Sequence, residues 1–257
     1  MSTPMRRLGR TGLSVSELGY GAWGIGKSMW IGADDETSLG ALREAIEHGV
    51  RFIDTAMAYG NGHSEELVGA AVRASGEEVV IATKIPPENQ SWPASPGDEV
   101  GDMYPGSWIV ECTERSLSSL GLGTVDVQQL HTWTDDWVGK GDWAQAVATL
   151  KEQGKIRFFG VSIRNFDPGS VLELIRSGLV DTVQVIYNVF EQGPAHAPGQ
   201  PALVERHPDD DPDVVLAGGG EELLRRRLLE DVVDHLHGVD ETALDELEHR
   251  ARVEVPD

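Results

Sequence analysis

The feature that most constrains the fold of this chain is a regular alternation of short apolar runs and amphipathic segments. Six runs are predicted to be strands: LGYG (18–21), FIDTA (52–56), VVIATKI (79–85), VDVQQLH (125–131), RFFGVS (157–162) and TVQVIY (182–187). Apolar residues at helical spacing predict helices between them, at 34–49, 64–76, 107–120, 142–153 and 168–177. This alternation predicts an α/β protein with a parallel sheet and right-handed crossovers.

The segments that follow the second and third strands carry strong local signals. Ser64 is placed as the N-cap of a helix that Gly76 ends, and Glu65 and Glu66 favour the positive end of its dipole. After the third strand comes PPENQSWPASPGDEVGDMYP, a Pro-rich loop over 86–105. Loops of that length in compact domains are usually functional or mobile.

The architecture is either a closed barrel or an open doubly wound sheet. An open sheet should carry a Gly-rich fingerprint after its first strand, but GYGAWGIG begins inside that strand and is not the fingerprint in its context. Polar residues end successive strands, Asp54, Lys84 and His131, with Tyr59 just beyond the second strand. In a closed barrel those ends converge on one mouth, where such folds keep their active sites. The barrel is favoured, and the chain length of 257 residues suits one such domain.

The motifs of this chain resemble those of the aldo-keto reductase family over about residues 5–192. The matching segments arrive in the family's order and spacing: LGRTGLSVSELGYGAWG, FIDTAMAYG, VVIATK, DVQQLH, GKIRFFGVS and DTVQVIYNVFEQ. The resemblance implies a TIM-type (β/α)₈ barrel that transfers a hydride between NADP(H) and a carbonyl or alcohol substrate. It also implies that Tyr59 is the general acid, that Lys84 and Asp54 tune it, and that His131 orients the substrate carbonyl.

Elementary chemistry supports those four roles. Hydride addition to a carbonyl leaves an alkoxide that needs a proton, whereas an unperturbed tyrosine has a pKa near 10. A lysine ammonium beside the phenol should lower that pKa, and an aspartate behind the lysine should keep it charged. Taken singly, each residue has a simpler structural explanation, such as a loop cap, a core side chain or a solvated strand end. Their joint placement at successive strand ends favours a site.

The later strands carry the residues that the resemblance implies for the cofactor. Ser162 and Gln184 match positions that hold the nicotinamide carboxamide, and Tyr187 matches the aromatic residue on which the ring stacks. Where the family sets an asparagine directly after the serine, this chain has Ile163, and Asn165 is out of register. NADP(H) is preferred by resemblance alone, so NAD(H) remains open.

Tryptophans follow several of the predicted strands. Trp23 follows the first strand, and Trp92 and Trp133 lie in the long loops of the barrel mouth. They are candidates for the wall of an apolar substrate pocket. The alternative, that they anchor these loops as hydrophobic plugs, is equally open.

The resemblance ends after Gln192. We expect one barrel domain over 1–257 with an irregular Pro- and Asp-rich linker at 193–212, followed at 213–257 by a late strand, DVVLA, and acidic helices. At most seven of the eight strands are recognisable, so the barrel is expected to be incomplete. Self-association could cover an exposed strand edge.

Composition restricts partners and compartment. Asp and Glu number 43 against 21 Lys and Arg, for a formal net charge of −22, which repels nucleic acid and anionic membranes. Five of the 21 basic residues are lysine, a balance that fits a salt-rich cytoplasm, although ordinary acidic solubility explains it equally well. The absence of a long apolar stretch and of a signal-like start predicts a cytoplasmic protein. The single cysteine, Cys112, is expected to be buried, and no metal site is expected.

Two hypotheses from different classes remain. The first is an NADP(H)-dependent carbonyl reductase or alcohol dehydrogenase. The second is a non-catalytic barrel whose altered C-terminal part has lost cofactor binding, with a regulatory or binding role, or a defective product. Binding of NADPH separates them, while the substrate and the oligomeric state stay open.

Overall fold

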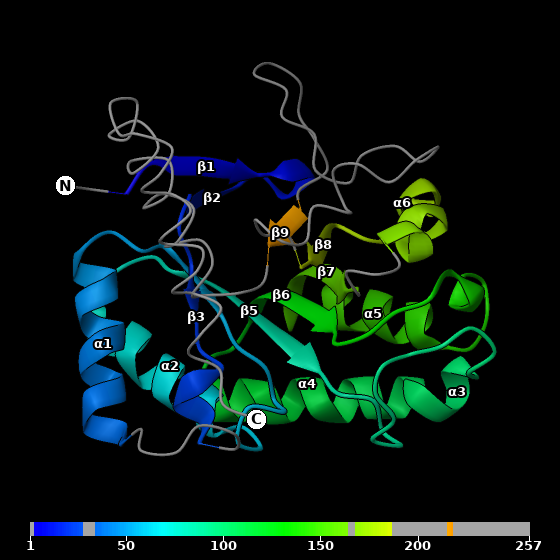
Figure 1. The fold of residues 1–257 in the computed structure, drawn as a ribbon, viewed down its shortest axis with the longest axis horizontal. Coiled ribbons are helices and arrows are strands. Elements are labelled where there is room, and N and C mark those ends of the chain that lie inside the picture. Colours follow the sequence, from blue (N-terminus) through cyan, green and yellow to red (C-terminus); the bar gives the residue numbers. More distant parts are fainter. Residues whose placement is uncertain (1–2, 28–33, 164–167, 187–214, 218–257) are drawn as a thin grey trace, which may run out of the picture. The chain divides into compact units, whose positions relative to one another are not determined.

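The protein is built around a seven-stranded parallel sheet. The computed structural model describes residues 3–27, 34–163, 168–186 and 215–217, all within Met1–Gly220, the first of two units into which the chain divides. The strands, in sheet order, are β3 (Tyr20–Gly21), β4 (Phe52–Asp54), β5 (Val80–Ile85), β6 (Val125–Leu130), β7 (Ile156–Ser162), β8 (Thr182–Val185) and β9 (Val215–Ala217) (Figure 1). Each of the six predicted strands is present, and β9 lies within DVVLA.

The order of the strands in the sheet distinguishes the two candidate architectures. Every strand pairs in parallel with the one before it in sequence, from β3 to β9. A doubly wound sheet would reverse direction at a switch point. Consecutive order with right-handed crossovers puts all the helices on one face, so the sheet must curl to bury the other.

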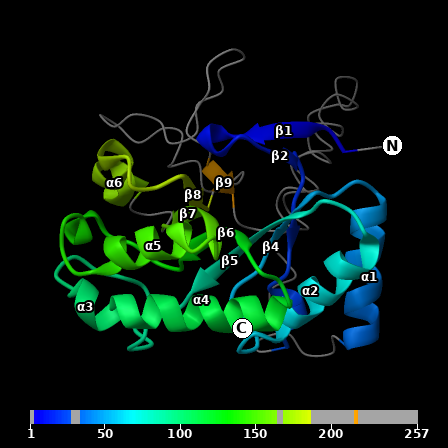
Figure 2. The same ribbon diagram turned by 180° about the vertical axis from the view of Figure 1, so that it is seen from behind.

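The helices that connect the strands pack side by side. They are α1 (Asp35–Glu47), α2 (His63–Ser75), α4 (Gly106–Leu120), α5 (Trp143–Glu152) and α6 (Leu172–Ser177), with the short α3 (Val100–Met103) in the long Pro-rich loop. Each of the pairs α1–α2, α2–α4 and α4–α5 is in contact, and Figure 2 shows the same succession from behind. The segment 168–177, predicted as one helix, begins as a 3-10 turn over Pro168–Val171.

Two helix ends follow the capping rules, and one predicted cap is misplaced. Asp34 caps α1 by accepting from the Thr37 backbone N–H at 2.8 Å, and Gly76 ends α2 in the left-handed conformation, as predicted. The placement of Ser64 as the N-cap is wrong, because α2 begins at His63 with Gly62 as its cap. Ser64 is instead fully buried, and its hydroxyl donates to the Ala22 carbonyl at 2.7 Å.

A β-hairpin at the start of the chain was not predicted. β1 (Met5–Leu8) and β2 (Leu13–Ser16) pair antiparallel. Three hairpin side chains pack with three side chains of the sheet in a separate apolar cluster, Leu8, Leu13, Val15, Phe52, Ala82 and Val127. Because side chains alternate along a strand, this cluster identifies the inner face of the sheet.

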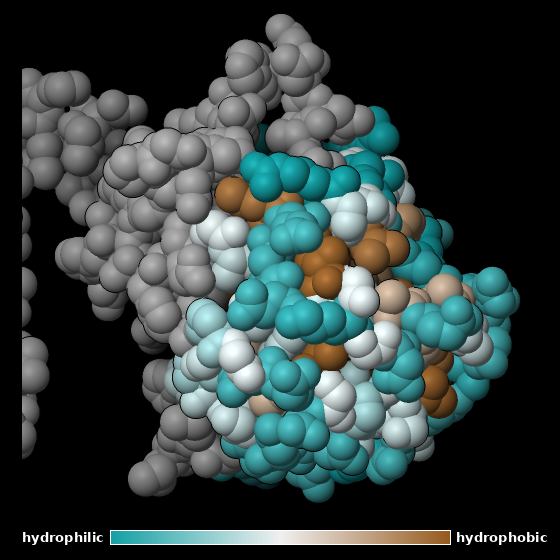
Figure 3. All heavy atoms as spheres, turned by 90° about the vertical axis from the view of Figure 1, so that its right-hand side faces the viewer, coloured by the Kyte–Doolittle hydropathy of each residue, from teal (hydrophilic) through white to brown (hydrophobic). Residues whose placement is uncertain are grey.

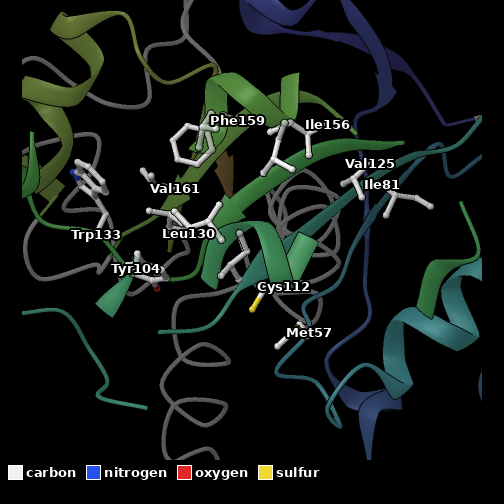
Figure 4. Close-up of a cluster of buried hydrophobic side chains, with 14 of the residues drawn as sticks. Met57, Ile81, Tyr104, Cys112, Val125, Leu130, Trp133, Ile156, Phe159 and Val161 are labelled. Atoms are coloured by element: carbon white, nitrogen blue, oxygen red, sulfur yellow. The ribbon is translucent and has the colours of Figure 1, made fainter. Parts of the chain in front are cut away.

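The larger core lies between the sheet and its helices (Figure 4). Ile53 and Ile81 contribute to it from the strand positions that alternate with Phe52 and Ala82. Cys112 belongs to this core and is buried, as predicted, and burial raises the pKa of its thiol to about 12. Alternation therefore places Asp54 and Lys84 on the inner face, beyond the hairpin cluster.

Candidate active site

Four ionisable side chains converge at the carboxyl ends of β4, β5 and β6. Asp54 is the last residue of β4, Lys84 lies next to the end of β5, and His131 directly follows β6. Tyr59 lies in the loop between β4 and α2. The structure thus brings together the four residues that the sequence singled out.

Lys84 and Asp54 form a buried ion pair. Lys84 Nζ donates to both carboxylate oxygens of Asp54 at 2.7 Å and to the carbonyl of Thr55 at 2.9 Å. The lysine is only 1% exposed, and a charge that deep is tolerated only when paired and hydrogen-bonded. Burial lowers the pKa of Lys84, but Asp54 and then Tyr59 raise it to a net value above that of an ordinary lysine. Lys84 is therefore an ammonium at neutral pH.

Tyr59 lies against this pair. Lys84 Nζ is 5.2 Å from the centroid of the Tyr59 ring. Burial raises the pKa of Tyr59, and the positive charge of Lys84 lowers it by less, so the net shift is upward. Lys84 thus lowers the pKa, as expected, but the cost of desolvating a phenolate exceeds that attraction. Tyr59 is a protonated phenol at neutral pH, with the lysine that would stabilise its phenolate beside it.

His131 contacts two aromatic rings by their edges. Its ring centroid is 5.7 Å from that of Tyr59 and 4.6 Å from that of Trp92. Burial, followed by the charge of Lys84, holds the pKa of His131 well below its ordinary value. His131 is therefore a neutral imidazole at neutral pH. Its Nδ1 is buried and has no hydrogen-bond partner among the described residues.

The Tyr59 loop is fixed by backbone contacts that only glycine permits. Gly60 has a φ of +70°, and a Cβ there would lie 2.0 Å from the carbonyl oxygen of Gly26. The Tyr59 N–H donates to Ala56, and the Tyr59 carbonyl accepts from Ser64. These contacts hold the phenol close to β4 and β5.

Two of the three residues predicted for the cofactor lie at the same end of the sheet. Ser162 and Gln184 are register partners on β7 and β8. Gln184 Nε2 donates to Asp54 Oδ2 at 3.3 Å, so the amide lies beside the Lys84–Asp54 pair. The third residue, Tyr187, lies outside the described residues. Ile163, which occupies the expected asparagine position, is buried.

Gln129 is a polar residue of this region that sequence reasoning missed. It is fully buried on β6 in register with Lys84, and its Nε2 donates to Gln184 Oε1 at 3.2 Å. Its Oε1 is buried without a hydrogen-bond partner among the described residues. The signal available was the pair of glutamines inside the otherwise apolar run VDVQQLH.

The three tryptophan candidates divide into two groups. Trp23 and Trp92 are each 44% exposed, and Trp92 contacts His131. Trp133 is 1% exposed and lies in the main core (Figure 4), where it packs edge-on against Trp137 and Trp143. For Trp133 the structure therefore fits the alternative of a loop anchor and not a pocket wall.

Among residues 3–27, 34–163, 168–186 and 215–217, no group of three or more His, Cys, Asp or Glu side chains could hold a metal ion. In the same part of the chain, every helix is too short or too polar to cross a membrane.

The sheet and the polar cluster at its carboxyl end define an α/β barrel protein with ionisable side chains at the barrel mouth. The chain belongs to the aldo/keto reductase family, whose model matches residues 17–198. The predicted resemblance and the TIM-type barrel fold are thereby confirmed. The predicted incompleteness concerns a segment that, apart from β9, lies outside the described residues.

Named relatives agree with this assignment. The aldo-keto reductase YhdN of Bacillus subtilis is 36% identical over 184 residues, 71% of this chain and 53% of that protein. The NADH-specific methylglyoxal reductase of Escherichia coli is 33% identical over 199 residues, 72% of this chain and 59% of that protein. The chain thus spans about half the length of the curated relatives it matches.

A solved structure gives the same result. An aldo/keto reductase from Klebsiella pneumoniae, crystallised with NADP and acetate, superimposes with a TM-score of 0.54 and 30% identity. The alignment covers 73% of this chain and 59% of that one.

Proposed function

We propose that this protein is an oxidoreductase that transfers a hydride between NADP(H) and a small aldehyde, ketone or alcohol, with Tyr59 as general acid. The observation that carries the proposal is the buried Lys84–Asp54 ion pair beside the Tyr59 phenol. A buried ion pair is costly to maintain. Because this ion pair lies beside a protonated phenol at the carboxyl ends of parallel strands, we infer that it serves proton transfer from that phenol.

In this reaction Tyr59 gives its proton to the substrate oxygen. Lys84 remains charged because Asp54 holds it on both carboxylate oxygens, and it stabilises the phenolate that is left. Because the pKa of Tyr59 is raised, the proton stays on the phenol until the substrate oxygen gains negative charge. In the oxidation direction the same phenolate takes the proton back.

His131 positions the substrate oxygen in this proposal. Its low pKa leaves the imidazole neutral, so it can donate one N–H without adding a second positive charge beside Lys84. Trp23 and Trp92, both partly exposed, are the candidates for the apolar side of the substrate site.

NADP(H), when bound, supplies or accepts the hydride. The residues present fit its nicotinamide end, because Ser162 is the register partner of Gln184, whose amide lies beside Asp54. Ser162 and Gln184 would hold the carboxamide, and Tyr187 would stack on the ring. We propose NADP(H) over NAD(H) because the family resemblance favours it. One relative, the methylglyoxal reductase of Escherichia coli, is NADH-specific, so NADH is the cofactor to compare with NADPH.

We also propose a cellular location, a type of surface, a condition for self-association and a domain plan for the whole protein. We propose a cytoplasmic protein with an acidic surface adapted to high salt, which excludes nucleic acid and anionic membranes as partners. Self-association is proposed only for the case in which the barrel is not closed. The domain plan of one barrel over 1–257, with a linker at 193–212 and a C-terminal segment at 213–257, remains a proposal as well.

Titration with NADPH tests the proposal. Binding would be followed by quenching of tryptophan fluorescence and energy transfer to the nicotinamide, at low salt and in molar KCl, with NADH titrated in parallel. Saturable binding supports the reductase, and methylglyoxal is the first substrate to assay. A folded protein that binds neither nucleotide in either buffer would overturn the proposal in favour of a non-catalytic barrel.

A further inference from the structure

A buried carboxyl group outside the Tyr59 cluster has no role in the reaction described above. Glu65, in the first turn of α2, is fully buried. The hydroxyl of Thr83 on β5 donates to its Oε1 at 2.5 Å. Its Oε2 and Ser116 Oγ on α4 are both buried and form no hydrogen bond of normal geometry within the described part of the chain, but Ser116 is close enough to act on the carboxyl and lower its pKa. The carboxyl therefore joins α2 to β5, in the space between the sheet and its helices.

No cation in the described part of the chain forms an ion pair with Glu65. The charged and titratable groups that act on it are Arg115 and Cys112 of α4 and Lys84 of β5. None of these forms an ion pair with Glu65 among the described residues: Lys84 binds Asp54, and Arg115 donates to Asn61 Oδ1 at 3.0 Å. Burial, the largest influence, raises the pKa of Glu65 above its ordinary value. These surroundings favour the uncharged acid.

The position of Glu65 links it to two residues of the cluster. Thr83 immediately precedes Lys84, and the two side chains lie on opposite faces of β5. The neighbour of Glu65, Ser64, donates its N–H to the Tyr59 carbonyl at 3.2 Å and shares a hydroxyl hydrogen bond with Thr55 at 2.9 Å. The start of α2 is thus tied both to the Tyr59 loop and to the strand that carries Lys84.

We propose that Glu65, as an uncharged carboxylic acid, is a positioning residue that fixes the start of α2 to β5 and thereby fixes the Tyr59 phenol relative to the Lys84 ammonium. The kinetic consequence rests on the proposed reductase function, while the structural consequence does not.

Three variants and one control test the kinetic consequence. In Thr83→Val and Glu65→Leu the tie is lost, and kcat should fall roughly 10- to 100-fold, with NADPH affinity retained, because small displacements of reacting groups are costly. Glu65→Gln should recover most of that loss relative to Glu65→Leu, since an amide oxygen accepts from Thr83 and no charge is required. Glu66→Gln changes the exposed neighbour on the same turn and should leave kcat unaltered. Equal loss in Glu65→Gln and Glu65→Leu would overturn the proposal.

Two further readouts do not need activity. The infrared spectrum should contain a protonated-carboxyl band that Glu65→Gln removes and that Thr83→Val shifts. The Tyr59 titration, taken as the phenolate absorbance that Tyr59→Phe removes, should move to higher pH in Thr83→Val because Lys84 stabilises the phenolate less. A Glu65 band of an ionised carboxylate, or an unchanged Tyr59 titration in Thr83→Val, would refute the inference. If the protein reduces no carbonyl, the proposed function fails, but these two measurements still decide the role of Glu65.

Discussion

At the level of single residues, the site combines a phenol that keeps its proton with a cation that would stabilise the phenolate. Burial acts on Tyr59 and Lys84 in the same sense, since it disfavours the charged form of each. Asp54 reverses that effect for Lys84 but adds to it for Tyr59. The result is an ammonium beside a neutral phenol, which is the starting state for proton donation.

Replacing Lys84 should separate these effects. In Lys84→Met the phenolate loses its stabilising charge, and Asp54 becomes a buried carboxylate without its cation. We expect kcat to fall by roughly 10²- to 10⁴-fold, the range typical of general acid catalysis, and the pKa of Tyr59 to rise. The double variant Asp54→Asn, Lys84→Met is the control, because it removes the unpaired charge. It should regain stability but not kcat, and recovery of kcat would contradict the role given to Lys84.

The neutral state of His131 predicts a pH dependence of stability. A histidine with a depressed folded pKa is protonated in the unfolded chain below pH ~6.5 while it stays neutral in the folded one. Its contribution to the free energy of unfolding should therefore decline by up to about 1.4 kcal/mol per pH unit as the pH falls below 6.5. Denaturant unfolding of the protein and of His131→Asn at pH 7, 6 and 5 measures this difference. A difference that does not change with pH would mean that His131 takes up a proton as readily in the folded protein as in the unfolded chain.

At the level of elements, the placement of α2 depends on a close approach to the end of α4. A Cβ on Gly69 would lie 2.0 Å from the Leu120 carbonyl oxygen, which also accepts from Arg73. Because backbone cannot give way as a flexible side chain can, Gly69 is what allows the two helices to meet there. The same helix carries Ser64 and Glu65 at its start, so its position matters to the site.

Gly69→Ala should therefore destabilise the protein by about 2 kcal/mol or more, since overpacking costs ~1–3 kcal/mol. The matched control is Gly40→Ala in α1, where an added Cβ meets nothing within 4 Å. That control should stabilise by up to about 1 kcal/mol through helix propensity alone. Chemical unfolding of both variants measures the two effects, and equal stability of the two would show that the Gly69 contact is unimportant.

How far the sequence predicts this structure can be judged element by element. The strands were predictable because runs such as VVIATKI are buried on both faces and carry a continuous apolar signal. The hairpin was not predictable, because its four-residue strands, set among arginines and glycines, are too short to show a clear alternation of apolar and polar residues. Ser64 was misplaced because capping preferences cannot reveal that a neighbouring loop, here Ala22, takes the hydroxyl.

The candidate site follows the same division. Asp54, Lys84 and His131 were predictable as polar residues at the ends of successive apolar strands, and the family resemblance supplied a role for Tyr59. The net direction of the shift in the Tyr59 pKa was not predictable, because it depends on how completely the folded loop excludes water from the phenol. Gln129 and Glu65 were missed for a related reason: the burial of a polar side chain is set by elements distant in sequence.

At the level of the whole molecule, the net charge of −22 is the dominant property. In Figure 3 the described part of this face is largely hydrophilic, with apolar residues in small separate patches. Acidic groups in excess repel one another in dilute buffer, whereas the screening length falls to about 3 Å in 1 M salt.

If that surface is adapted to high salt, the thermal unfolding midpoint should rise by several degrees between dilute buffer and molar KCl. Calorimetry in KCl, with an equal osmolality of sucrose as the control for solute exclusion, measures the effect. An equal midpoint in dilute buffer and in KCl would assign the acidic composition to ordinary solubility.

The most direct test of the account compares the protein with Tyr59→Phe in single-turnover oxidation of NADPH by a carbonyl substrate, with NADPH binding measured on both proteins. The phenylalanine keeps the ring against Lys84 and His131 but removes the proton. We predict equal NADPH affinity and a rate of NADPH oxidation lower by roughly 10²-fold or more in the variant. An unchanged rate in Tyr59→Phe would show that another group gives the proton and would contradict the central claim.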